Sequence, residues 1–135
     1  MSRKPIRVLV IDDSPLVREL IVDSLLAQYG FEIAGVAADG FQGLQLLEEL
    51  RPDVVTLDLQ MPGKDGLTTL EEILQRRPTP VIVVSALTQR AAESAVDALQ
   101  RGAMDYVAKP EGMAAMRKSF GEELPAKIRN MVGVD

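Results

Sequence analysis

Apolar runs alternate with amphipathic stretches along most of the chain. Five short runs have the length and composition of strands. The run at 81–84 is apolar at every position, which indicates a strand buried on both faces, whereas the weaker run at 31–36 is expected nearer an edge of a sheet. The predicted strands cover residues 6–11, 31–36, 53–57, 81–84 and 104–108.

Between the predicted strands, apolar residues recur every three or four positions, which indicates helices. The first helix is expected to begin with Ser14 as N-cap and Pro15 in the first turn, and to end near Gly30. Three more helices are predicted from residue 39, over 65–76 and over 89–101, the last ending at Gly102. The residues expected to face the sheet are Val17, Ile21 and Leu25, then Phe41, Leu44 and Leu47, then Leu67, Leu70 and Leu74, and finally Ala92, Ala95, Val96 and Leu99.

The pattern is weaker after Lys109-Pro110. Residues 111–118 are expected to form a loop. A last helix is predicted from about Glu122, with Pro125 in its first turn because a proline deeper in a helix removes a hydrogen bond. Its inward-facing residues would be Leu124, Ile128 and Met131.

Strands that alternate with helices predict a parallel sheet, because each parallel return needs a crossover. Right-handed crossovers cover both faces of the sheet. We therefore expect a doubly wound α/β fold, a flavodoxin-like three-layer sandwich with strand order 2-1-3-4-5. The length of 135 residues predicts one domain over residues 1–135, with a core at about 6–110 and the last helix and the start of a linker at about 120–135.

Composition narrows the range of partners and chemistry. The net charge of −5 argues against nucleic acid or an anionic membrane as a partner. The chain has no cysteine and no histidine, which excludes disulfides, a histidine base and histidine-ligated zinc. The apolar run after the basic N-terminus is too short for a signal peptide or a membrane span, so a cytoplasmic location is expected.

Polar side chains stand at the ends of four predicted strands. Asp12 and Asp13 close the first strand, Asp58 the third, Ser85 the fourth and Lys109 the fifth. Taken alone, each has an ordinary explanation as a solvated strand end, a surface lysine or a cap. In a parallel sheet, however, they would meet at one edge. Clustered carboxylates repel one another unless a cation joins them, and Mg²⁺ binds carboxylates together with phosphate oxygens.

These residues therefore suit a divalent metal, Mg²⁺ with Mn²⁺ as a substitute, and a phosphoryl group. Carboxylates form acyl phosphates, which makes Asp58 a candidate nucleophile towards phosphorus. Lys109 and the metal would offset charge on the transferred group. Ser85 would donate a hydrogen bond to a phosphoryl oxygen.

In order and spacing, the chain resembles the receiver domain of two-component response regulators from about residue 6 to residue 110. The resemblance implies that Asp58 accepts phosphate from a sensor histidine kinase, and that Ser85 and Lys109 contact the phosphoryl group. It also implies a metal site made of Asp12, Asp13, Asp58 and the backbone carbonyl of Gln60. The matching segments are Val8–Ser14, Pro52–Asp58, Met61–Gly66, Val83–Ala86, Gly102–Tyr106 and Lys109-Pro110.

Tyr106 matches the switch aromatic of that family. Without the resemblance, it would be interpreted as an amphipathic ring on an edge strand. With it, Ser85 and Tyr106 form a switch: Ser85 moves towards the phosphate, Tyr106 rotates inward, and the surface of the fourth helix, fifth strand and fifth helix changes.

Several segments resemble, more narrowly, the regulatory domain of the chemotaxis protein-glutamate methylesterase. They are residues 51–58, 77–89, 107–110 and 122–129. That family carries a C-terminal hydrolase domain with a Ser-His-Asp triad, and the resemblance implies that phosphorylation loosens the packing of the receiver over the hydrolase site. This chain has no histidine and no Gly-x-Ser-x-Gly elbow, so we expect no hydrolase activity of its own. It would be either the regulatory domain of a methylesterase or a stand-alone regulator of another output.

Three other functions fit the sequence less well. A phosphohydrolase that turns over through an aspartyl phosphate usually has a second aspartate two positions after the nucleophile, where this chain has Gln60. A nucleotide or flavin binder is disfavoured because no Gly-x-Gly-x-x-Gly or P-loop spacing is present. A scaffold that works without phosphorylation would not need the complete acidic set.

Overall fold

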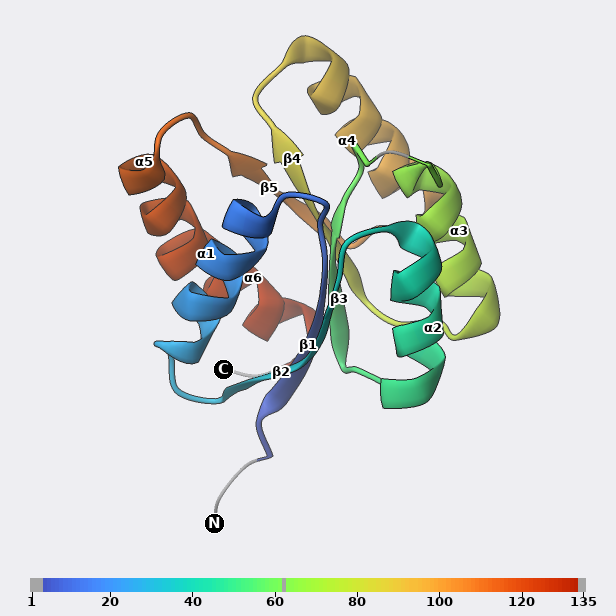
Figure 1. Ribbon diagram of the computed structural model, residues 1–135, viewed down its shortest axis with the longest axis horizontal. Coiled ribbons are helices and arrows are strands. Elements are labelled where there is room, and N and C mark those ends of the chain that lie inside the picture. The colour runs from blue at the N-terminus through green and yellow to red at the C-terminus, as the bar shows by residue number, and fades with distance from the viewer. Residues whose placement is uncertain (1–3, 62, 134–135) are drawn as a thin grey trace.

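Five parallel strands form the centre of the molecule, in the order β2-β1-β3-β4-β5 (Figure 1). This computed structural model describes residues 4–61 and 63–133, so the ends of the predicted domain and Pro62 lie outside the described residues. The predicted strand order and doubly wound fold are confirmed. The strands are β1 (Ile6–Ile11), β2 (Phe31–Ala37), β3 (Val54–Asp58), β4 (Val81–Ala86) and β5 (Asp105–Lys109).

Helices cover both faces of the sheet, as Figure 1 shows. They are α1 (Pro15–Leu26), α2 (Gly40–Leu50), α3 (Gly66–Arg76), α4 (Gln89–Arg101), α5 (Met113–Lys118) and α6 (Leu124–Met131), with a π-helical turn, η1 (Ser119–Glu123), between the last two. Ser14 is the N-cap of α1, as predicted, and its side chain accepts a hydrogen bond from the Val17 amide. No helix within residues 4–61 and 63–133 combines the length and the apolar character needed to cross a membrane.

The sheet separates two hydrophobic cores. Along β1, Val8 and Val10 pack with α1 and α6, whereas Leu9 and Ile11 pack with α2 and α3. This alternation follows from the two-residue period of a strand, and it explains why the central strands are apolar at nearly every position.

The inward face predicted for α4 is confirmed for Ala95, which is buried, and for Leu99, which is partly buried, but it is wrong for the other two residues. Ala91, Ala95 and Ala98 are buried, whereas Ala92 and Val96 lie on the exposed side of the helix. Alanines spaced by four and three residues fit closely against the sheet, and this leaves the larger Val96 55% exposed.

The predicted inward faces of α2 and α3 also need correction. Phe41 is 65% exposed, and only Leu44 and Leu47 of the three residues predicted for α2 are buried. In α3, Thr69 and Ile73 are fully buried, and Leu67 and Leu74 are only partly buried. Phe41 stands at the start of α2 beside Lys64, whose ammonium lies 4.7 Å from the centre of the ring.

Helix α1 ends earlier than predicted, at Leu26 instead of near Gly30. Gly30 belongs to the turn into β2, where it adopts a φ of 91° that favours glycine, and its carbonyl accepts a hydrogen bond from the Ile6 amide.

The prediction of a loop at 111–118 is wrong, because α5, η1 and α6 form one helical run from Met113 to Met131. Good helix formers after Gly112 outweigh the missing apolar stripe. Pro125 cannot donate a backbone hydrogen bond, and the wider π-helical turn ends at Glu123, two residues before it. Phe120 in this turn is fully buried, so the core continues beyond residue 110 to Ile128.

Candidate functional site

Three carboxylates meet at the carboxyl edge of the sheet. Asp12 and Asp13 follow β1, and Asp58 is the last residue of β3, the strand that pairs with β1. One oxygen atom from each lies within 4.8 Å of the others. Asp12 and Asp58 are only 1% and 3% exposed, whereas Asp13 is open to solvent. The predicted cluster therefore forms, with two members buried and one accessible.

Backbone amides of the following turns hold the two buried carboxylates. The Ser14 amide donates a hydrogen bond to Asp12 Oδ1 at 2.9 Å, and the Gln60 amide donates to Asp58 Oδ1 at 3.0 Å. The second oxygen of each carboxylate faces Lys109, whose Nζ lies 2.8 Å from Asp12 Oδ2 and 3.3 Å from Asp58 Oδ2. Lys109, at the end of β5, thus forms ion pairs with both acids at the edge of the sheet, which is the edge predicted from the sequence.

The folded protein disfavours the ionised form of the Asp58 carboxyl group, so the pKa of this group is raised. Burial is the main cause, and together with the charge of Asp12 it raises the pKa of Asp58 from 3.8 to about 6, although Lys109 and the Gln60 amide act in the opposite direction. A second cation at the site would lower the free-energy cost of ionising Asp58.

The residues present fit a divalent metal ion. Asp12 Oδ2 is fully buried and accepts no hydrogen bond from the described residues, although the Lys109 ammonium lies near it. Carboxylate oxygens of this kind are ligands that Mg²⁺ and Mn²⁺ prefer. The exposed Asp13 leaves one side of the cluster open to solvent.

Within the described residues, the side chains of Ser85 and Tyr106 form no hydrogen bond with the three acids. The Ser85 hydroxyl donates a hydrogen bond to the Ala91 carbonyl at 3.3 Å, so it is directed to the start of α4. Tyr106 is 44% exposed. A pocket of about 320 Å³ lies next to both side chains, and Ala92, Ala95 and Ala108 are among the other residues that line it.

The sequence did not single out two residues that shape the turns of the site. Arg18 in α1 donates a hydrogen bond from Nη1 to the Asp12 carbonyl at 2.8 Å. Gly66 at the start of α3 packs on the backbone of Leu59, where an added Cβ would lie 2.4 Å from the Leu59 Cα. The signals that could have identified them are an arginine soon after a helix start and the glycine that closes the turn after Asp58.

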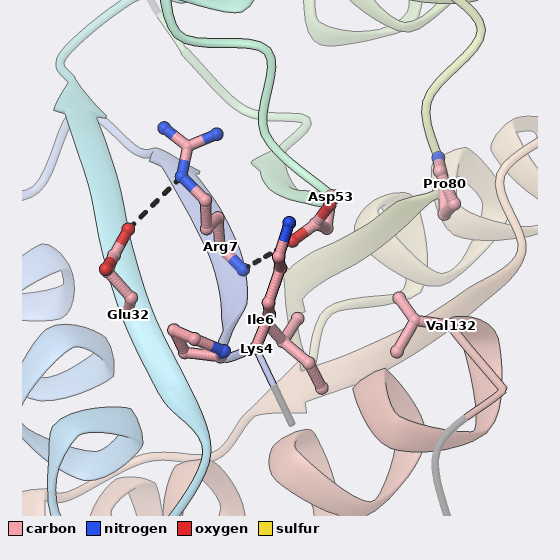
Figure 2. Close-up of a pocket in the computed structure, with 8 residues that line it drawn as sticks. Lys4, Ile6, Arg7, Glu32, Asp53, Pro80 and Val132 are labelled. Carbon is pink, nitrogen blue, oxygen red and sulfur yellow. Dashed lines mark hydrogen bonds and ion pairs between the residues drawn. The ribbon is translucent and has the colours of Figure 1, made fainter. Parts of the chain in front are cut away.

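A separate hollow of about 630 Å³ lies at the opposite edge of the sheet and contains none of the acidic cluster. Figure 2 shows Arg7 between Glu32, with which it forms an ion pair at 3.1 Å, and Asp53, which accepts a hydrogen bond from the Arg7 amide. The Arg7 guanidinium also donates to the carbonyls of Leu50 and Arg51. These contacts join β1 to its neighbours, which is a structural role.

The fold and the site together define a class of protein. Residues 8–120 match the response regulator receiver domain family, and the chain belongs to this family. It is 51% identical over 130 residues to protein-glutamate methylesterase/protein-glutamine glutaminase 2 of Koribacter versatilis, and 45% identical over 128 residues to the corresponding protein of Symbiobacterium thermophilum. These alignments cover 96% and 94% of this chain, but it spans only 36% and 35% of those relatives.

Among solved structures, the response regulator domain of Thermotoga maritima CheB is similar over nearly the whole chain. The TM-score is 0.86 at 37% sequence identity, and the match covers 98% of this chain and 99% of that domain. The receiver domain of NtrX from Brucella abortus is also similar, with a TM-score of 0.79 at 29% identity over 95% of this chain and 99% of the other. The resemblance to methylesterase regulatory domains is thereby confirmed.

Proposed function

We propose that this chain is a phosphoacceptor of a two-component phosphorelay, in which a sensor histidine kinase transfers a phosphoryl group to Asp58. The observation that carries the proposal is the environment of Asp58 Oδ2. This oxygen lies 3.3 Å from the Lys109 ammonium, and a carboxylate oxygen of Asp58 lies within 4.8 Å of one from Asp12 and one from Asp13. Membership of the receiver family supports the same assignment.

In this proposal, Asp58, Lys109 and the metal-binding residues have different roles in phosphoryl transfer. An Asp58 oxygen attacks phosphorus, the bond from phosphorus to the histidine nitrogen of the kinase breaks, and the imidazole leaves. Lys109, already paired with Asp58, offsets the charge of the transferred group. Asp12, Asp13, Asp58 and the backbone carbonyl of Gln60 would hold Mg²⁺ or Mn²⁺, which when bound supplies further positive charge.

The switch in this proposal consists of Ser85 and Tyr106. The Ser85 hydroxyl exchanges the Ala91 carbonyl for a phosphoryl oxygen, and Tyr106 turns from its exposed position into the pocket beside it. The signal then passes to partners through the surface around α4 and β5, where Leu87, Val96 and Met104 are exposed.

For the longer protein, we propose that this domain occupies residues 1–135 and regulates a protein-glutamate methylesterase through a linker and a C-terminal hydrolase domain. The identity to two methylesterases supports this, because their remaining two thirds lie outside the match. Chemotaxis proteins and a histidine kinase would be its cytoplasmic partners, and nucleic acid and membranes would not. A stand-alone regulator is the alternative, and the reading frame downstream of this chain distinguishes the two: a hydrolase domain with a Ser-His-Asp set supports the methylesterase.

Intact-mass analysis with acetyl phosphate tests the phosphoacceptor assignment. We expect the wild type to gain one phosphoryl group with Mg²⁺, and neither wild type with EDTA nor Asp58→Asn to gain any. An unchanged wild-type mass, or an equal gain in the variant, contradicts the assignment. Sustained turnover of external phosphate esters would instead favour the phosphohydrolase, which Gln60 disfavours.

A further inference from the structure

Lys127 of α6 lies against the edge strand β5 and contacts Tyr106 in two ways. Its ammonium donates a hydrogen bond to the Tyr106 carbonyl at 2.8 Å and lies 5.2 Å from the centre of the Tyr106 ring. It also pairs with Asp105 at 3.5 Å and with Glu123 at 3.3 Å. Four groups therefore fix the position of this ammonium beside the aromatic ring.

The pocket next to Tyr106 lies on the other side of β5. Val107 packs in the core shared with α1 and α6, so its neighbours Tyr106 and Ala108 face the α4 side of the sheet. Both line the pocket of about 320 Å³ together with Ser85. Lys127 contacts the ring from α6, and Tyr106 also lines the pocket, so the same residue adjoins both the ammonium and the pocket.

We propose that Lys127 is a positioning residue that holds Tyr106 in its exposed orientation and so sets how readily the switch responds. This inference rests on the proposed function, because it assumes that Tyr106 turns into the pocket on phosphorylation. In this proposal the contacts of Lys127 with the Tyr106 carbonyl, Asp105 and Glu123 are the same in both orientations, because none of them involves the ring, and only the ring contact differs. A contact shifts an equilibrium only if it differs between the two states.

The expected size of the effect follows from the cation–π contact. At a partly exposed site such a contact changes an equilibrium by about two- to fivefold. By linkage, its removal should increase the apparent affinity of the site for a phosphoryl-like ligand by the same factor. If Lys127 acted only through its charge, its removal would lower the affinity for the phosphoryl-like ligand, because the loss of a positive charge weakens the binding of an anion.

The test is a titration with beryllium fluoride and Mg²⁺, followed by ¹⁹F NMR of protein labelled with 3-fluorotyrosine. The chain has two tyrosines, and Tyr29→Phe assigns the Tyr106 signal. We expect Lys127→Met to reach half-saturation at about two- to fivefold lower beryllium fluoride, and Lys127→Arg to behave as wild type, because a guanidinium also stacks on the ring. Lys118→Met is the matched control, since Lys118 is exposed and forms no ion pair within the described residues.

A double-mutant cycle isolates the ring contact. In a Tyr106→Leu background, followed by Mg²⁺-dependent beryllium fluoride binding measured by calorimetry, Lys127→Met should no longer tighten binding, whereas in Tyr106→Phe it should. If the wild-type Tyr106 signal does not move on saturation, the proposed switch is wrong and the role of Lys127 falls with it. If that signal moves but Lys127→Met binds equally or more weakly, the switch stands and the positioning role is refuted.

Discussion

Replacement of Asp58 by asparagine should stabilise the protein in the absence of metal. The pKa of Asp58 is raised from 3.8 to about 6, so the folded state pays for ionising this group once the pH exceeds its pKa. A difference of about two units corresponds to roughly 3 kcal/mol, and this value already includes the attraction between Asp58 and Lys109. Asparagine keeps the oxygen that accepts from the Gln60 amide. We therefore expect a gain of about 1–3 kcal/mol in the free energy of unfolding.

The sign and the pH range of this effect are fixed by the direction of the shift. A group whose pKa is higher in the folded state stabilises that state below its unfolded pKa, here 3.8, and this stabilisation is lost as the pH rises through about 6. The free energy of unfolding of Asp58→Asn should be higher than that of the wild type at about pH 8 and equal to it at about pH 4.

Urea unfolding followed by circular dichroism measures this difference, because the chain has no tryptophan. The measurements are made with EDTA and then with saturating Mg²⁺, which should stabilise the wild type more than the variant. A variant that is less stable than wild type at about pH 8, or one with the same gain at about pH 4, would refute the reasoning.

Three further predictions concern the packing and charge around the site, each measured by urea unfolding. Lys109→Met leaves the buried Asp12 and Asp58 without their cation, so without metal it should lower the free energy of unfolding by up to about 3 kcal/mol. Mg²⁺ should restore part of this loss, and an unchanged stability would contradict the ion pairs. Gly66→Ala forces a Cβ against the Leu59 backbone and should cost about 1–3 kcal/mol, whereas the control Gly121→Ala meets open space and should be neutral or stabilising. Phe120→Ala should cost about 3–5 kcal/mol. The exposed Phe41→Ala should cost at most about 1 kcal/mol, because it loses only the contact with Lys64, and equal losses would refute the assigned burial.

The sequence predicts the topology and the acidic cluster because both depend on strand order alone. Once strands ending in Asp12 and Asp58 are parallel neighbours, their carboxylates have to meet at the same edge. Lys109 is predicted for the same reason, as the last residue of another parallel strand.

Which side chains face the core depends on tertiary packing, and the local sequence pattern of a helix or strand does not contain this information. The alanine-rich helix α4 offers two apolar stripes, and only contact with the sheet selects Ala91 and Ala98 over Ala92 and Val96. A hydroxyl at a strand end has acceptors on both sides, so the hydrogen bond from Ser85 to the Ala91 carbonyl is visible only in the structure. Phe120 was missed because the π-helical turn breaks the regular helical spacing by which inward residues are recognised.

The most direct test of the phosphoacceptor site is to locate the modified residue chemically. The protein is incubated with acetyl phosphate and Mg²⁺, the acyl phosphate is reduced with borohydride, and the peptides are mapped by mass spectrometry. We predict homoserine at position 58 and at no other aspartate, including the neighbouring Asp12 and Asp13. A product at either of those positions, or none anywhere while the protein binds Mg²⁺, would contradict the assignment of Asp58.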